Sequence, residues 1–183
     1  EAAGEGHVIM SYEESYGYML GDYVRDKDAV TASLLITEMA AWYAAKGMTL
    51  YDAIQALYEK YGYYREGIAT MTLKGIDGAA QIQQIMDRAR QSTPAKLGAF
   101  DVLAVRDYKA DTRKDLKTGE VTATGLPSSN VLYYELSDNA WCCVRPSGTE
   151  PKIKFYVGVK GDTLDGADQM LEELKAEVLK HFE

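Results

Sequence analysis

The sequence predicts an α+β protein, in which a compact antiparallel sheet with helices on one face is preceded by part of an α/β unit. Three observations support this fold class. After residue 62, strand-like segments outnumber the two segments with helical spacing of apolar residues. Two of those strand-like segments are separated by only three residues, as in a hairpin. The N-terminal third contains one strand-like and two helical segments, too few for an independent domain.

In the N-terminal third, the predicted strand is residues 7–11, and a polar, tyrosine-rich loop punctuated by glycine follows it. The first helix covers residues 29–47, with Asp28 as its N-cap. This helix is apolar nearly all round, so we expect it to be buried. Thr49 and Asp52 form an approximate capping box that begins the second helix.

The rest of the chain supplies the predicted sheet and two further helices. In order, we expect a strand over 63–73, a helix over 76–90, strands over 100–105, 131–136, 140–145 and 152–159, and a final helix after 161–163. A polar excursion over 107–127 is predicted to be an exposed loop or hairpin. The last strand alternates strictly, which places Lys152 and Lys154 on one face and apolar residues on the other.

Composition excludes several classes of protein. The net charge of −8 argues against a general nucleic-acid or anionic-membrane surface. No apolar run reaches the roughly 20 residues of a membrane span, and no signal-peptide pattern opens the chain. Cys142 and Cys143 are adjacent in a strand, so their side chains point to opposite faces and no disulfide is expected. We therefore expect a cytoplasmic protein. Because it starts at Glu1, we expect an excised piece of a longer one.

A short segment between the last two strands gathers groups that suit a phosphate. Arg145 offers a planar fork of donors, Ser147 and Thr149 offer hydroxyls, and Gly148 permits close approach of the backbone. Lys154 adds a second positive charge at the start of the next strand. The same residue types also occur in an ordinary strand-to-strand turn, so on composition alone both interpretations stay open.

Two segments resemble the α-D-phosphohexomutase family. The first, at residues 145–157, is RPSGTEPKIKFYV, which is similar to the phosphate-binding signature of the family's C-terminal domain. Its approach from residue 126 resembles the phosphoglucomutase branch. The second, at residues 12–30, is YEESYGYMLGDYVRDKDAV, which resembles the family's sugar-recognition loop. The resemblance implies that residues 1–61 are the end of the third domain, and that residues 62–183 are a fourth domain with a TATA-binding-protein-like α+β fold.

The resemblance also implies the substrate contacts. Glu13, Ser15 and Lys27 would bind the sugar, and the non-transferring phosphate would lie against the loop after the penultimate strand. The residues implied for that phosphate are Arg145, Ser147, Gly148, Thr149 and Lys154. Without the resemblance, Glu13 and Lys27 would be ordinary solvated charges. Some family members carry Gly where this chain has Tyr12, a departure that leaves the choice of sugar open.

The implied activity is interconversion of glucose 1-phosphate and glucose 6-phosphate through a phosphoserine, with glucose 1,6-bisphosphate as intermediate. The phosphoserine and the aspartate loop that binds Mg²⁺ belong to earlier domains of the family, so no catalytic or metal-binding residue is expected in this chain. Its partners would be a sugar phosphate and the missing N-terminal domains. Phosphomannomutase or phosphopentomutase specificity stays open. So do a non-catalytic phosphosugar-binding module and a purely structural domain.

Overall fold

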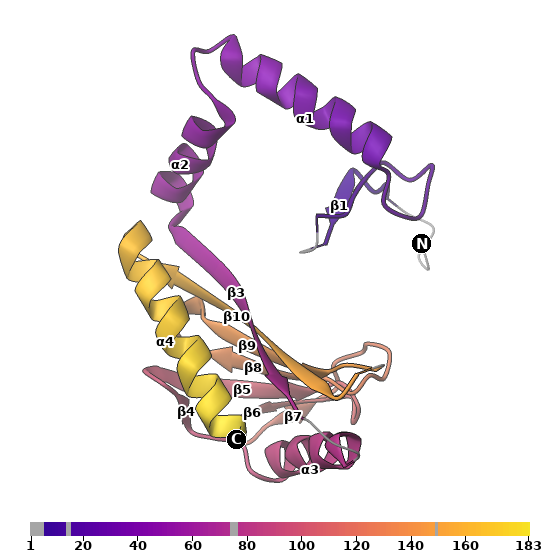
Figure 1. Ribbon diagram of the computed structural model, residues 1–183, viewed down its shortest axis with the longest axis vertical. Helices are drawn as coiled ribbons and strands as arrows, with labels where there is room; N and C mark the ends of the chain where they lie inside the picture. The colour runs from indigo at the N-terminus through magenta and orange to yellow at the C-terminus, as the bar shows by residue number, and fades with distance from the viewer. Residues whose placement is uncertain (1–5, 14–15, 74–76, 149) are drawn as a thin grey trace. The chain divides into compact units, whose positions relative to one another are not determined.

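The computed structural model describes residues 6–13, 16–73, 77–148 and 150–183, and the chain divides into two compact units, Glu1–Lys60 and Tyr61–Glu183. The first unit contains a small antiparallel hairpin and two helices (Figure 1). Its elements are β1 (Met10–Tyr12), β2 (Tyr18–Leu20), α1 (Ala29–Ala44) and α2 (Leu50–Tyr61).

Local sequence signals begin both helices of the first unit, as predicted. The Asp28 carboxylate accepts a hydrogen bond from the Val30 N–H at 2.9 Å, so Asp28 is the N-cap of α1. At the start of α2, Asp52 N–H donates to Thr49 Oγ1 at 3.1 Å and Thr49 N–H donates to Asp52 Oδ2 at 2.8 Å. This reciprocal pair is a capping box, and it satisfies N–H groups that lack a partner within the helix.

The expectation that the first helix is buried is wrong for this structure. None of the residues of α1 is buried, and Val30, Leu34 and Trp42 are 79%, 60% and 54% exposed. A helix that is apolar nearly all round needs packed neighbours on every side. Apart from α1, the described part of this unit contains only a hairpin of two three-residue strands and one helix, which are too few to surround it.

The second unit is built on an antiparallel sheet of eight strands (Figure 1). Across the sheet the order is β3 (Tyr63–Thr72), β10 (Lys152–Gly161), β9 (Trp141–Pro146), β8 (Leu132–Leu136), β5 (Phe100–Asp107), β6 (Thr112–Asp115) and β7 (Val121–Thr122), with β4 (Lys96–Leu97) paired to β5. The predicted polar excursion contains the short β6–β7 hairpin. The predicted three-residue connection at 137–139 is a 3₁₀ turn between β8 and β9.

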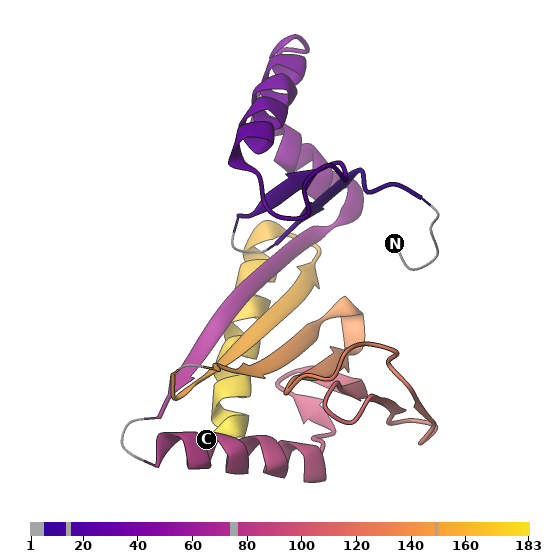
Figure 2. The same ribbon diagram turned by 90° about the vertical axis from the view of Figure 1, so that its right-hand side faces the viewer.

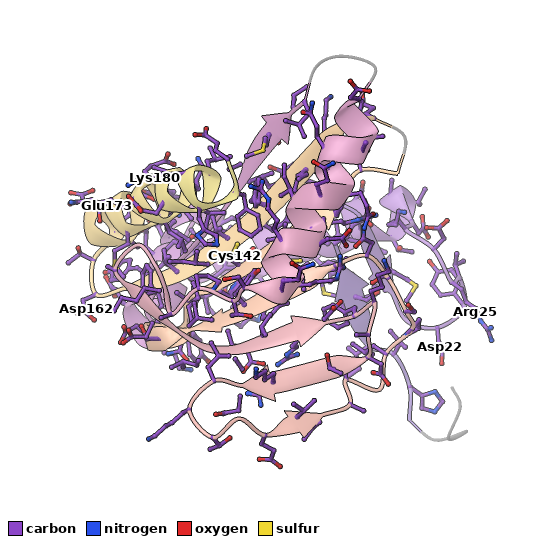
Figure 3. All side chains as sticks on the ribbon, turned by 90° about the horizontal axis from the view of Figure 1, so that it is seen from below. Asp22, Arg25, Cys142, Asp162, Glu173 and Lys180 are labelled. Atoms are coloured by element: carbon purple, nitrogen blue, oxygen red, sulfur yellow. The ribbon has the colours of Figure 1, made fainter. Side chains whose placement is uncertain are left out.

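Helices α3 (Gly78–Gln91) and α4 (Leu164–Phe182) pack on one face of this sheet, with α4 running along the strands (Figures 1 and 2). The apolar stripes predicted for both helices are buried against the strands. Cys142 lies in this interior, beneath the helices (Figure 3), whereas Cys143 on the other face is half-buried. Both thiols are free, as the alternation predicted. In the part of the chain that the structure describes, no helix combines the length and apolarity needed to cross a bilayer.

The face of the sheet opposite the helices carries an ion-pair network centred on Glu135 of β8. Arg113 donates to both carboxylate oxygens of Glu135, at 2.9 and 2.6 Å, and Arg106 donates to one of them at 2.6 Å. The hydrogen bond from Arg113, followed by that from Arg106, lowers the pKa of the Glu135 carboxyl below its ordinary value of 4.5. The network therefore ties together strands β5, β6 and β8.

We expect Glu135→Gln to lower the free energy of unfolding at pH 7 by about 1 kcal/mol, because the Arg106 and Arg113 side chains are 39% and 35% exposed and therefore screened by water. A carboxyl whose folded-state pKa is depressed stabilises the protein above its unfolded pKa, and this stabilisation disappears as the pH falls through the folded-state pKa. The difference between the variant and the wild type should thus shrink below pH 4.5. Urea titrations at several pH values measure this. Glu66→Gln, at an exposed position on β3, is the matched control.

Candidate functional site

The hairpin of β9 and β10 positions the two cations predicted to bind phosphate. Val144, Ile153 and Phe155 are fully buried under the helices, so Arg145 and Lys154, which alternate with them, lie on the opposite face. In the register of the hairpin, Arg145 is the Cα partner of Lys154. Directly opposed residues of an antiparallel pair have Cβ atoms about 4.5–5.5 Å apart. The structure therefore places the two cationic residues directly opposite each other on the same face of the hairpin.

This pair of like charges costs stability unless an anion compensates it. Both side chains are exposed, and among the described residues neither forms an ion pair. Lys152, by contrast, has a partner: its Nζ lies 3.1 Å from Glu150 Oε2. Arg145 and Lys154 thus form an open cationic pair, whose charge is available to a ligand.

The turn that connects β9 to β10 is held by short-range hydrogen bonds. Ser147 N–H donates to the Lys152 carbonyl at 2.8 Å, and Lys152 N–H donates to the Glu150 carbonyl at 2.8 Å. Glu150 N–H donates to Ser147 Oγ at 3.3 Å. The Ser147 hydroxyl therefore accepts a hydrogen bond within the turn. Thr149, predicted to contribute a second hydroxyl, lies outside the described residues.

Neither the backbone conformation nor the packing of the described residues requires glycine at position 148. Its φ is not in the left-handed region, and a Cβ added to it would meet no atom within 4 Å. The space in front of its backbone is therefore open to a ligand. Such an approach by an oxyanion is a frequent reason for glycine in a binding loop.

The segment predicted to recognise the sugar forms the turn of the β1–β2 hairpin, where the sequence predicted a loop or irregular turn. Tyr12 and Tyr18 are register partners, and Glu13 N–H donates to the Gly17 carbonyl at 2.9 Å. Tyr16 adopts φ +66°, in the left-handed region. Glu13 therefore stands at the base of the turn. Ser15, its predicted companion in sugar binding, lies outside the described residues.

Lys27 joins Glu13 beside this turn. The Lys27 Nζ lies 3.7 Å from Glu13 Oε1 and 3.3 Å from Asp26 Oδ1. The hydrogen bond with Asp26 is the main cause that raises the pKa of Lys27, and the Glu13 charge adds to it, so Lys27 is positively charged at neutral pH. The structure thus brings together two of the three residues predicted to bind the sugar.

A hollow of about 250 Å³ opens at this place. Its lining includes Glu13 and Lys27, together with Ser11, Tyr12, Gly17, Met19, Arg25 and Asp26. A carboxylate and an ammonium group at its wall can accept from and donate to neighbouring hydroxyls of one sugar. Its size and lining suit part of a monosaccharide, with the remainder open to the surroundings.

The described residues do not form a metal site. Among residues 6–13, 16–73, 77–148 and 150–183, no three His, Cys, Asp or Glu side chains gather in a way that could hold an ion. Mg²⁺ requires oxygen ligands in near-octahedral geometry. The donor set described here does not fit that ion.

Sequence reasoning missed three features of the site. The opposition of Arg145 and Lys154 follows from the register of β9 and β10, which the predicted strand lengths alone did not determine. The hairpin around Glu13 consists of strands only three residues long, below the length at which alternation is readable. The contact of Asp26 with Lys27 was visible only as a run of alternating charges.

Comparison with known protein families identifies both units. The family model "Phosphoglucomutase/phosphomannomutase, alpha/beta/alpha domain III" matches residues 1–61, and "Phosphoglucomutase/phosphomannomutase, C-terminal domain" matches residues 82–178. The second match alone covers more than half of the chain. The chain therefore belongs to the phosphoglucomutase/phosphomannomutase family and carries the family's C-terminal domain.

Curated relatives are phosphoglucomutases from staphylococci. The chain is 35% identical to that of Staphylococcus haemolyticus over 88% of its own length and 29% of the relative's length. It is 34% identical to that of Staphylococcus epidermidis over 92% of its own length and 31% of the relative's length. For one of the Staphylococcus aureus proteins, the identity is 34%, with 92% and 30% covered. The chain thus spans about 30% of the length of these relatives.

A solved structure supports the fold. The chain resembles parafusin, a phosphoglucomutase-related phosphoprotein from Paramecium, in its open form, with a TM-score of 0.52 over 92% of the chain and 30% of that protein. The two sequences are 14% identical, so this likeness concerns the fold alone. Together with the C-terminal domain match, it confirms the predicted α+β architecture.

Proposed function

We propose that this chain is the substrate-binding, C-terminal portion of a phosphoglucomutase that interconverts glucose 1-phosphate and glucose 6-phosphate. In this proposal, residues 1–61 complete the third domain and carry the sugar-recognition hairpin, and residues 62–183 are the fourth domain and carry the phosphate loop. Membership of the family and the phosphoglucomutase relatives support the assignment.

The observation that carries the proposal is the open cationic pair of Arg145 and Lys154. A phosphate dianion between them relieves their repulsion and accepts charge-assisted hydrogen bonds, which are about twice as strong as neutral ones. Ser147, Gly148 and Thr149 supply the hydroxyls and backbone N–H groups that complete its coordination. Since the loop contacts the phosphate itself, it accepts a phosphate carried at either end of the sugar.

Sugar recognition is assigned to the other unit. Glu13 accepts hydrogen bonds from the sugar hydroxyls, Lys27 donates to a neighbouring oxygen, and Ser15 contributes a hydroxyl. These contacts are directional, so they orient the sugar as well as bind it. Binding energy from such groups, remote from the reacting phosphoryl, can be used to position it for transfer.

The chemical step belongs to the rest of the full-length protein. There a phosphoserine would transfer its phosphoryl group to the sugar phosphate, giving glucose 1,6-bisphosphate, and the serine would then take back the other phosphoryl group. Mg²⁺ held by residues outside this chain would supply charge stabilisation. The residues of this chain hold and orient the substrate. A phosphomannomutase or phosphopentomutase would use the same phosphate clamp, which is formed by Arg145, Ser147, Gly148, Thr149 and Lys154. These alternatives are separated by comparing kcat/KM of the full-length protein for glucose, mannose and pentose phosphates.

We expect this chain alone to produce no glucose 6-phosphate from glucose 1-phosphate and Mg²⁺, because no phosphoryl carrier is assigned to its residues. A coupled dehydrogenase assay measures this, with the full-length protein as positive control. Turnover by the chain alone contradicts the assigned division of labour.

Titration with inorganic phosphate, followed by NMR at the amides of residues 145–150, tests the clamp directly. Unchanged amide shifts at millimolar phosphate would favour a purely structural unit.

A further inference from the structure

The turn of the sugar-recognition hairpin contains a glycine whose role no motif explains. We infer that Gly17 is a positioning residue for sugar recognition. Its missing side chain leaves the space in which Glu13 and Lys27 lie together beside the turn. This inference rests on the proposed function, because it concerns how the sugar contacts are arranged.

The backbone does not require glycine at this position. The residues in the left-handed region include Tyr16 and Gly21 on either side, and Gly17 is not among them. Glycine is explained instead by the lack of room for a side chain at this position. A Cβ built on Gly17 would lie 2.5 Å from Glu13 Oε1, 2.5 Å from Lys27 Cγ and 2.9 Å from Glu13 Cδ. These separations are far below van der Waals contact, so neither side chain could keep its place.

Both side chains reach Gly17 from fixed backbone positions. Glu13 lies directly across the turn, since its N–H donates to the Gly17 carbonyl. Lys27 comes from the segment before α1, and its neighbour Asp28 donates its backbone N–H to the Tyr18 carbonyl at 2.9 Å, next to Gly17. A side chain at position 17 would therefore separate the Glu13 carboxylate from the Lys27 ammonium and reshape the 250 Å³ hollow that they line.

The three atoms nearest to the added Cβ belong to two flexible, partly exposed side chains, and none of these three is a backbone atom. An added methyl group should accordingly displace Glu13 and Lys27 while the hairpin keeps its fold. This predicts an unusual combination for a glycine substitution: a defect in substrate recognition with little loss of stability. A purely structural glycine would show the reverse.

The test is Gly17→Ala in the full-length protein. We expect kcat/KM for glucose 1-phosphate to fall about 10-fold to 100-fold, as for a small misplacement of positioning groups. The melting temperature should stay within about 2 °C of the wild type, the effect of a small change in stability. Gly21→Ala is the matched control from the same segment. Gly21 has φ +74°, and its Cβ would come no closer than 3.6 Å to a side chain. This control should lower the melting temperature and leave kcat/KM unchanged.

A double-mutant cycle establishes that Gly17 acts through its two neighbours. Glu13→Ala and Lys27→Ala each remove atoms that would collide with the new methyl group, and the double variant removes the three nearest of them. In the Glu13→Ala/Lys27→Ala background, Gly17→Ala should therefore lower kcat/KM by less than about 2-fold, within the limits of additivity. An equal loss in both backgrounds, or a large fall in melting temperature for Gly17→Ala, overturns the inference.

The single variants separate this inference from the proposed function. If Glu13→Ala and Lys27→Ala lower kcat/KM but Gly17→Ala does not, the sugar contacts stand and Gly17 has no positioning role. If neither Glu13→Ala nor Lys27→Ala changes kcat/KM, the assignment of sugar recognition to this hairpin is itself wrong, and the inference about Gly17 falls with it.

Discussion

Arg145→Ala in the full-length protein is expected to weaken binding of the sugar phosphate by about 2–5 kcal/mol, the cost of removing one partner from a close charged pair. Arg145 provides a planar fork that bonds two phosphate oxygens at once, and Lys154, its register partner, cannot replace that geometry. The loss should appear in kcat/KM, because the bound phosphate also positions the sugar for the transfer step.

Two further variants show whether the guanidinium is specifically required. Arg145→Lys retains the charge without the fork, so we expect an intermediate loss of kcat/KM. Lys114→Ala removes an exposed cation on β6 of the same unit and should leave kcat/KM unchanged. Circular dichroism checks that each variant is folded. A folded Arg145→Ala enzyme with the kcat/KM of the wild type would refute the phosphate clamp.

Phe155→Ala should cause the largest loss of stability among the substitutions considered, about 3–5 kcal/mol of the free energy of unfolding of the second unit. Phe155 is fully buried on β10, between the neighbouring strands β3 and β9. Its ring centroid lies 5.0 Å from that of Phe182 at the end of α4. Truncation removes this contact and leaves a cavity where the sheet and the helix meet.

Amide hydrogen exchange of β10 at increasing urea concentrations measures the effect within this unit alone. Leu103→Ala is the matched control, because Leu103 is an apolar side chain of the same sheet that is 49% exposed. We expect the control to cost less than about 1 kcal/mol. Equal protection of the β10 amides in Phe155→Ala and Leu103→Ala would show that the interior is not organised around this strand.

The second unit was predictable from sequence because its signals are local and agree with one another. Strict alternation in the last strand placed Phe155 inside and Lys154 outside, and the structure confirms both. Cys142 and Cys143 separated to opposite faces for the same reason. In the first unit, the apolar character of α1 predicted burial, and this prediction is wrong for the structure. Burial would require packed elements on every side of the helix, which the described part of this unit does not provide.

The site was predictable in part. Motif resemblance selected Arg145 and Lys154, whereas their direct opposition depends on the pairing register, which the sequence does not state. Glu13 and Lys27 are far apart in sequence, and their meeting depends on how the segment before α1 returns to the hairpin. Gly17 could not be selected in advance, since its importance lies in the space it leaves empty.

The distribution of buried side chains has a practical consequence. Apart from Ala53, every buried apolar residue in the described ranges belongs to the second unit. That unit thus possesses its own interior, and the strand that follows the turn, β10, is paired with β9 on one side and with the sequence-distant strand β3 on the other. The second unit should consequently fold without the first. Fused to an unrelated carrier, residues 61–183 should retain the amide spectrum that they show in the intact chain.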